Sequence, residues 1–126
     1  MASILIVEDD EQIRVLATSI LEDAGYKVVA ATGADGSQAL VESDQPIDVM
    51  FIDLTLGSDP EAGLKAAQKA RESRKNLAML YTTGAGLNEG TKALFTGPSL
   101  FLPKPYTAEQ LTKSVAFLLL KPHVPK

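Results

Sequence analysis

The chain has 126 residues, which is the usual size of a single domain. It contains no cysteine, which excludes a disulfide scaffold, a thiolate zinc site, a cysteine nucleophile and an iron–sulfur cluster. Its 12 basic and 16 acidic residues give a formal net charge of −4, which argues against a protein that binds mainly to nucleic acid phosphates.

Membrane and export signals are missing from this sequence. The longest uninterrupted apolar run covers residues 115–120, far fewer than the about 20 residues that a membrane helix needs. The amino terminus has no basic segment, and acidic residues begin at Glu8, too early for a signal peptide. We expect no membrane association and a cytoplasmic location, with which a cysteine-free chain is compatible.

In chain order, the first two elements are a strand and a helix. Residues 3–7 (SILIV) are apolar and rich in β-branched side chains, which predicts a buried strand. In residues 11–24, apolar side chains recur at helical spacing and predict an amphipathic helix whose inner face consists of Ile13, Leu16, Ala17, Ile20 and Leu21. Gly25 follows where a helix C-cap is expected.

The same alternation continues to the end of the chain. We predict further strands over residues 27–31, 47–52, 77–82 and 100–102, and further helices over residues 36–43, 62–73, 87–95 and 107–120. Thr107 and Gln110 have the spacing of a capping box at the start of the last helix. Five strands alternating with five helices predict an α/β fold with an open, doubly wound parallel sheet. The functional site of such a fold lies at the carboxyl ends of the strands.

No internal repeat or linker interrupts the pattern, so residues 1–121 are predicted to form one domain. Residues 122–126 (PHVPK) contain two prolines, and we expect a frayed tail or the start of a linker there.

Chemically active side chains follow four of the five predicted strands. They are Glu8, Asp9 and Asp10 after the first strand, Asp53 after the third, Thr82 and Thr83 at the fourth, where Gly84 follows, and Lys104 after the fifth. Clustered carboxylates suit Mg²⁺. An aspartate beside a divalent cation can attack phosphorus, and ammonium and hydroxyl groups can bind the phosphoryl oxygens. The residues therefore indicate metal-assisted phosphoryl transfer onto Asp53.

Each of these groups also has a purely structural interpretation. The acidic run can be a favourable helix start, and Asp53 can be an N-cap. The threonines can be ordinary strand residues, and Lys104 can be a solvated surface lysine. The coincidence of all four groups at one edge of a sheet favours a functional site over four separate structural roles.

Four motifs occur together in one order: ILIVEDDEQIR, VMFIDL, MLYTTG and FLPKPY. With them the sequence resembles the receiver domain of two-component response regulators, the CheY-like family, over about residues 3–120. The resemblance implies a flavodoxin-like sheet with strand order 2-1-3-4-5. It also implies that residues 1–121 are a receiver domain and that the domain phosphorylates and dephosphorylates itself without being a metabolic enzyme.

The resemblance implies a role for individual residues. Asp53 is the phosphoacceptor, Asp9 binds Mg²⁺ directly, Glu8 binds it largely through water, and the backbone carbonyl of Thr55 completes the metal site. Thr83 and Lys104 contact the phosphoryl group. Thr83 then forms a switch with Phe101, the residue at the family's switch aromatic position.

The implied phosphodonor is a histidine kinase or a histidine phosphotransfer protein. Phosphorylation is expected to alter the face near the fourth helix and the fifth strand. An output partner or a second copy of the chain is expected at the last helix and fifth strand, with no direct nucleic acid contact.

Three features depart from the family pattern. Gly57 stands four residues after the phosphoacceptor, where the family usually has proline. The following segment, residues 54–63, is about two residues longer than usual and carries Asp59 and Glu61, which we expect to point into water. Gly90 is a weak helix former within the predicted fourth helix, which puts the usual output face in doubt.

Other interpretations are open to test. One is a receiver-like interaction module that no longer cycles phosphate, with the long acidic loop as the cause. Another is a phosphatase of the haloacid-dehalogenase type, but that family has a second aspartate where this chain has Thr55. The glycines at 84, 86 and 90 have the wrong spacing for a dinucleotide site. The apolar residues 115–120 predict either a well-buried last helix or a partner surface.

Overall fold

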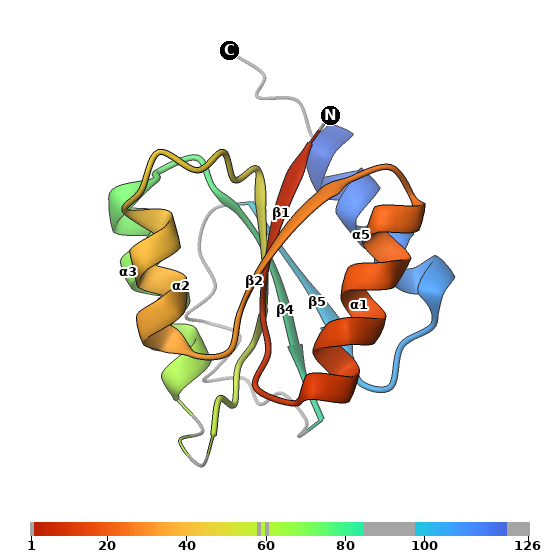
Figure 1. Cartoon of the computed structure of the whole chain (residues 1–126), viewed down its shortest axis with the longest axis horizontal. Coiled ribbons are helices and arrows are strands. Elements are labelled where there is room, and N and C mark those ends of the chain that lie inside the picture. Colours follow the sequence, from red (N-terminus) through yellow and green to blue (C-terminus); the bar gives the residue numbers. More distant parts are fainter. Residues whose placement is uncertain (1, 58, 60, 85–97, 121–126) are drawn as a thin grey trace.

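The computed structural model describes residues 2–57, 59, 61–84 and 98–120 (Figure 1). Within these residues, one parallel sheet lies between two layers of helices. The strands are β1 (Ser3–Val7), β2 (Lys27–Ala31), β3 (Val49–Asp53), β4 (Ala78–Thr83) and β5 (Ser99–Pro103). The helices are α1 (Glu11–Asp23), α2 (Ala34–Val41), α3 (Ala62–Ser73) and α5 (Ala108–Leu120).

The strand order is β2-β1-β3-β4-β5, which confirms the predicted doubly wound sheet. Every residue of β1, β3 and β4 is buried, as expected for strands that are covered on both faces. Helices α2 and α3 cover one face of the sheet, and α1 and α5 cover the other (Figure 1). The core is therefore divided by the sheet into two apolar layers.

Local signals in the sequence explain where the helices begin and end. Asp10 caps α1 by accepting a hydrogen bond from the N–H of Ile13 through Oδ1 at 3.1 Å. Gly25, with φ of +98°, follows the end of α1 in a conformation that favours glycine. Thr107 and Gln110 form the predicted capping box before α5, with reciprocal bonds of 2.8 and 3.0 Å.

The predicted element bounds differ from the observed ones in a few places. β3 and β4 each begin one or two residues later than predicted and end one residue later, so Asp53 and Thr83 are the last residues of their strands. Leu16 was predicted on the inner face of α1, but it is 61% exposed, because the part of the helix that contacts the sheet is narrower than the apolar stripe. The predicted helix over residues 87–95 and the predicted tail 122–126 lie outside the described residues.

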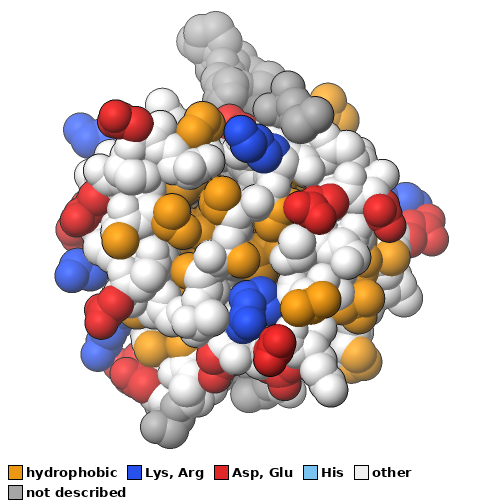
Figure 2. Space-filling view, in the orientation of Figure 1, with side chains coloured by type: hydrophobic (Ala, Val, Ile, Leu, Met, Phe, Trp, Pro, Cys, Tyr) orange, Lys and Arg blue, Asp and Glu red, His pale blue; other side chains and the backbone are white. Residues whose placement is uncertain are grey.

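Figure 2 shows the face of the molecule that carries β2, and apolar side chains gather near its middle. β2 is an edge strand, and Val28 and Val29 are only half-buried in it. In α5, Leu118 is buried and Phe117 is 57% exposed, so this helix has both a core face and an apolar outer face. None of the described helices is both long and apolar enough to span a bilayer.

The strand register brings the carboxyl ends of β3, β4 and β5, where candidate site residues lie, to one edge of the sheet. Asp53 lies opposite Thr82, and Thr83 lies opposite Pro103, directly before Lys104. α3 starts close beneath this edge, because Gly63 packs against the backbone of Asp53 and donates its N–H to the carbonyl of Leu54 at 2.9 Å. The sheet and α3 together hold the backbone of Asp53 in place.

Candidate functional site

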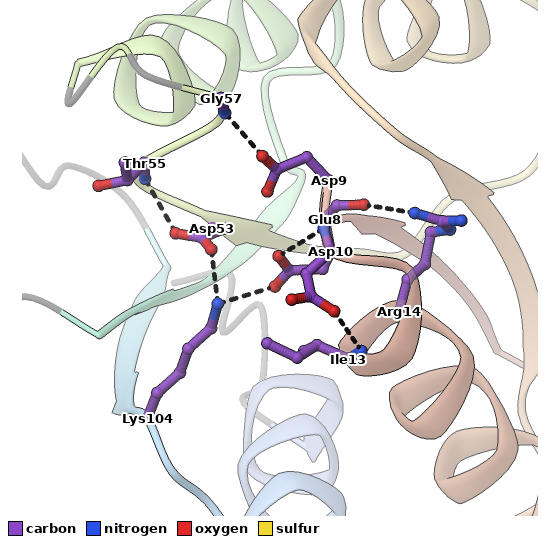
Figure 3. Close-up of polar contacts among 9 residues, drawn as sticks. All are labelled: Glu8, Asp9, Asp10, Ile13, Arg14, Asp53, Thr55, Gly57 and Lys104. Carbon is purple, nitrogen blue, oxygen red and sulfur yellow. Dashed lines mark hydrogen bonds and ion pairs between the residues drawn. The ribbon is translucent and has the colours of Figure 1, made fainter.

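A buried cluster of charged groups lies at the carboxyl edge of the sheet (Figure 3). Glu8 is 4% exposed and Asp53 is 5% exposed. The Lys104 ammonium lies between them, with Nζ 2.6 Å from Oδ2 of Asp53 and 3.0 Å from Oε1 of Glu8. Three side chains from β3 and from the ends of β1 and β5 therefore form one ion network.

The electrostatics of this network follow from burial and pairing. Burial raises the pKa of Glu8, and the neighbouring charge of Asp53 adds to this, although bonds from Lys104 and the Asp10 N–H partly oppose it. Burial lowers the pKa of Lys104, but the hydrogen bonds to Asp53 and Glu8 and the charges of these two groups together outweigh burial, and the net pKa is raised. The ammonium is thus held in its charged form between two buried carboxyl groups.

Backbone donors fix the orientation of the two buried carboxyl groups. The N–H of Thr55 donates to Oδ1 of Asp53 at 2.9 Å, and the N–H of Asp10 donates to Oε2 of Glu8 at 3.2 Å. Arg14 donates from Nη1 to the backbone carbonyl of Glu8 at 3.0 Å, which ties the start of α1 to the end of β1. Each carboxylate therefore has one oxygen toward Lys104 and the other toward a backbone amide.

Asp9 completes a group of three carboxylates. Ligand oxygens of Glu8, Asp9 and Asp53 lie within 4.8 Å of one another. Asp9 differs from the other two in being exposed, and its Oδ2 accepts a hydrogen bond of 2.8 Å from the N–H of Gly57. Two buried carboxylates and one exposed carboxylate form an all-oxygen donor set that fits Mg²⁺. Glu8, Asp9 and Asp53 are the side chains that would hold the ion.

The remaining predicted residues lie close to this edge. Thr83 is 5% exposed at the end of β4, and its carbonyl accepts the N–H of Lys104 at 3.2 Å. Thr55 lies two residues beyond β3, and it is half-buried. Phe101 is also half-buried, and it packs against the apolar layer on the α2 and α3 side of the sheet. The structure thus brings Glu8, Asp9, Asp53 and Lys104 into direct proximity and puts Thr83 on the adjacent strand end.

Two residues near the site, Tyr106 and Thr82, receive no individual role from the family resemblance, although Thr82 is among the candidate groups at the end of the fourth strand. Tyr106 contacts Phe51 edge to face, with ring centroids 5.7 Å apart, and lines a small void beside Glu8, Asp53 and Thr82. Burial and the charge of Glu8 raise the pKa of Tyr106 to about 12. Thr82 Oγ1 is buried there and, within the described part of the chain, has no hydrogen-bond partner. Tyr106 lies in the FLPKPY motif and Thr82 in the MLYTTG motif, but no local sequence signal sets either residue apart from its neighbours.

Comparison with known proteins identifies the family to which this fold belongs. The family model of the response regulator receiver domain matches residues 4–116. The chain belongs to this family. As a receiver domain it is a signalling domain of two-component systems.

Individual relatives agree with this assignment. The chain is 30% identical over 109 residues to the nitrogen assimilation regulatory protein NtrX of Azorhizobium caulinodans, covering 86% of this chain and 24% of that protein. It is 34% identical over 119 residues to the CAI-1 autoinducer sensor kinase/phosphatase CqsS of Vibrio cholerae, covering 90% of this chain and 17% of that protein. The chain therefore spans only a minor part of these relatives.

A solved structure of similar size supports the same fold. A response regulator receiver protein from Sinorhizobium medicae superposes with a TM-score of 0.85 at 28% identity, over 95% of each chain. The receiver domain described here retains the strand order and the acidic edge expected from the resemblance, with Gly57 in place of the usual proline.

Proposed function

We propose that the domain accepts a phosphoryl group on Asp53 from a phosphohistidine. A carboxylate oxygen of Asp53 attacks the phosphorus, an acyl phosphate bond forms, and the phosphorus–nitrogen bond breaks with its electron pair returning to the imidazole. The donor is a histidine kinase or a histidine phosphotransfer protein, and we assign the exchange to the cytoplasm. Hydrolysis of the acyl phosphate by water resets the domain.

The residues around Asp53 have distinct parts in this proposal. The Lys104 ammonium, which lies 2.6 Å from Oδ2 of Asp53, pairs with the negatively charged phosphoryl oxygens once the group is transferred. Thr83 donates its hydroxyl to another phosphoryl oxygen. Mg²⁺ held by Glu8, Asp9, Asp53 and the backbone carbonyl of Thr55 supplies positive charge beside the reacting group. The Thr55 N–H keeps the Asp53 carboxylate oriented during the reaction.

The observation that carries the proposal is the buried network of Lys104, Asp53 and Glu8. Two buried carboxyl groups and one ammonium cost desolvation energy. A core that served stability alone could replace them with apolar side chains. Retaining them at the carboxyl edge of a doubly wound sheet, beside an exposed third carboxylate, favours a site for a cation and an anionic group.

The signalling consequence rests on Thr83 and Phe101. In this proposal, Thr83 moves toward the phosphoryl group and opens space near β5. Phe101, which is half-buried in the unphosphorylated structure, then moves inward. The two arrangements present different faces at β5 and α5. We propose that an output partner or a second copy of the domain reads this difference there, where Phe117 and Leu120 are exposed.

Phosphorylation by a small phosphodonor tests the proposal without a kinase. The protein is incubated with acetyl phosphate and Mg²⁺, and intact mass is measured beside Asp53→Asn. Asp59→Asn serves as the matched control, because Asp59 lies in the loop after β3 and is exposed. We expect one Mg²⁺-dependent phosphoryl adduct in the wild type and in Asp59→Asn, and none in Asp53→Asn.

Other outcomes would redirect the assignment. No adduct on a folded wild-type protein would contradict the proposal and favour a phosphate-independent interaction module. An adduct that persists in Asp53→Asn would mean that the acceptor is another residue. An adduct that forms equally in the presence of EDTA would contradict the metal site.

A further inference from the structure

One hydrogen bond joins two loops that are far apart in the sequence. The N–H of Gly57, in the loop after β3, donates to Oδ2 of Asp9, in the loop after β1, at 2.8 Å across 48 residues (Figure 3). Both residues are exposed. This contact is the link between the outermost carboxylate of the site and the loop that departs from the family pattern.

Asp9 needs such a contact more than the other two carboxylates do. Glu8 and Asp53 are buried and paired with Lys104, so their surroundings hold them. An exposed aspartate beside two other acidic groups gains by turning into water, where its charge is better solvated. A hydrogen bond from an amide to a carboxylate is charge-assisted and opposes this movement.

The bond leaves Asp9 able to bind a cation. It uses Oδ2 only, and an ionised carboxylate offers acceptor sites on both oxygens. The Asp9 carboxylate is held with its oxygens near those of Glu8 and Asp53. The same carboxylate is therefore oriented by the loop and available to the metal.

Glycine is specifically suited to this position. Gly57 has a φ of +64°, a left-handed conformation that glycine adopts without strain. Proline, which the family usually has here, has no N–H and holds φ near −65°. It can neither adopt this backbone conformation nor donate this bond. A Cβ at Gly57 would meet no atom within 4 Å, so the constraint comes from the backbone and not from space.

We propose that the backbone N–H of Gly57 is a positioning group for Asp9, and that the loop after β3 thereby sets the affinity of the receiver domain for Mg²⁺. The proposal rests on the proposed metal site and adds Gly57 to the residues that determine its affinity for Mg²⁺. Hydrogen-bond donors that orient metal ligands typically contribute about 10- to 100-fold in metal affinity. We place the Gly57 contact at the lower end of this range, because the bond is solvent-exposed.

Three substitutions vary the N–H and the backbone conformation at this position. Gly57→Pro removes the donor together with the left-handed conformation. Gly57→Asn keeps the donor, and asparagine tolerates the left-handed region. Gly57→Ala keeps the donor but is strained at this φ. Mg²⁺ is titrated into each unphosphorylated protein, and binding is followed by amide chemical shifts in ¹H–¹⁵N NMR spectra.

We expect Gly57→Asn to bind Mg²⁺ within about threefold of the wild type and Gly57→Pro to bind it about 10-fold more weakly. Equal affinities of Gly57→Pro and the wild type would overturn the proposal. Equal weakening in Gly57→Asn and Gly57→Pro would also overturn it, because Gly57→Asn keeps the N–H and loss of the N–H could then not account for the weaker binding. If the wild type binds no Mg²⁺, the proposed metal site itself fails.

A second measurement does not depend on the proline variant folding. In Asp9→Ala, without Mg²⁺, the Gly57 amide proton should shift upfield and exchange faster with solvent, because its acceptor is lost. Asp59→Ala is the matched control in the loop after β3, since its Oδ1 accepts from the Glu61 N–H and not from Gly57. An unchanged Gly57 amide in Asp9→Ala would overturn the proposal.

Discussion

The carboxyl edge of the sheet has an inner and an outer part that are stabilised differently. In the inner part, Glu8 and Asp53 are buried and share the Lys104 ammonium. In the outer part, Asp9 is exposed, and its carboxylate accepts a hydrogen bond from the Gly57 amide in the loop after β3. The inner part is held by strand ends and ion pairs, and the outer part by the conformation of one glycine.

This difference explains how one site can be both rigid and responsive. Breaking a buried ion network leaves a charge without a partner and costs much stability. Changing an exposed hydrogen bond costs little stability but alters where a ligand oxygen lies. We therefore expect changes in the inner part to affect folding, and changes in the outer part to affect metal binding with little effect on folding. The Gly57 variants test the outer part, and four further predictions test the inner part.

The largest effect is expected for Lys104→Met. It leaves two buried carboxyl groups without their cation, and we expect a loss of about 3 kcal/mol in unfolding free energy. Lys113→Met is the matched control, because Lys113 forms an exposed pair with Glu109 at 2.8 Å and should change little. Urea unfolding at neutral pH with EDTA measures both. A similar stability for the two variants would contradict the distinction between buried and exposed pairs.

Gly63→Ala should disturb the inner part through the backbone. A Cβ at Gly63 would approach the carbonyl oxygen of Asp53 and the backbone of Leu54 far too closely, so α3 or the end of β3 must move. We expect a loss of about 2 kcal/mol in unfolding free energy and weaker phosphorylation of Asp53. Gly36→Ala in α2 is the control, since its Cβ would meet Ala31 at an ordinary 3.5 Å. Equal stability of the two variants would count against this packing.

A smaller effect of opposite sign is expected for Thr82→Val. The buried Thr82 hydroxyl lacks a partner within the described residues, and valine has the same shape without the polar atom. We expect the unfolding free energy to rise by about 1 kcal/mol. Thr82→Ser keeps the hydroxyl and loses a methyl group, so it should be less stable than the wild type. Thermal unfolding ranks the three proteins, and a destabilised valine variant would mean that the hydroxyl has a partner.

The smallest effect is expected for Tyr106→Phe and appears only at alkaline pH. Folding raises the pKa of Tyr106 from 10.0 to about 12, so the folded protein keeps a proton that the unfolded chain loses. The associated stability is fully present below pH 10 and is lost as the pH rises toward 12. Tyr106→Phe should therefore lose stability less steeply over this range. Parallel slopes of unfolding free energy against pH for the two proteins would contradict the assignment.

The alternation of strands and helices, and the edge at which the site lies, could be predicted from local patterns, whereas the strand order followed from the family resemblance. Strands β1, β3 and β4 end at Val7, Asp53 and Thr83, each within one residue of its predicted end, and parallel strands bring their carboxyl ends to one edge. The capping box of Thr107 and Gln110 was also predictable, because both partners lie within one helical turn. These features depend on residues that are close in the chain, so local patterns contain the information.

The contacts across the site could not be predicted in the same way. Glu8 and Asp9 are adjacent acidic residues, and no local pattern predicts which of them is buried. In the structure, packing buries Glu8 and leaves Asp9 exposed. Similarly, Leu16 fits the apolar stripe of α1 but lies outside its contact with the sheet. The direction in which a side chain points is decided by neighbours from other elements, which no local spacing reveals.

The sequence by itself determined that this chain forms a doubly wound parallel sheet with carboxylates, threonines and a lysine at one edge, because periodicity and strand ends are properties of short segments. Only the tertiary structure decided that Lys104 bridges Asp53 and Glu8 and that Gly57 holds Asp9. These contacts join segments that are distant in the chain, and their distances depend on strand register, helix packing and the φ of one residue.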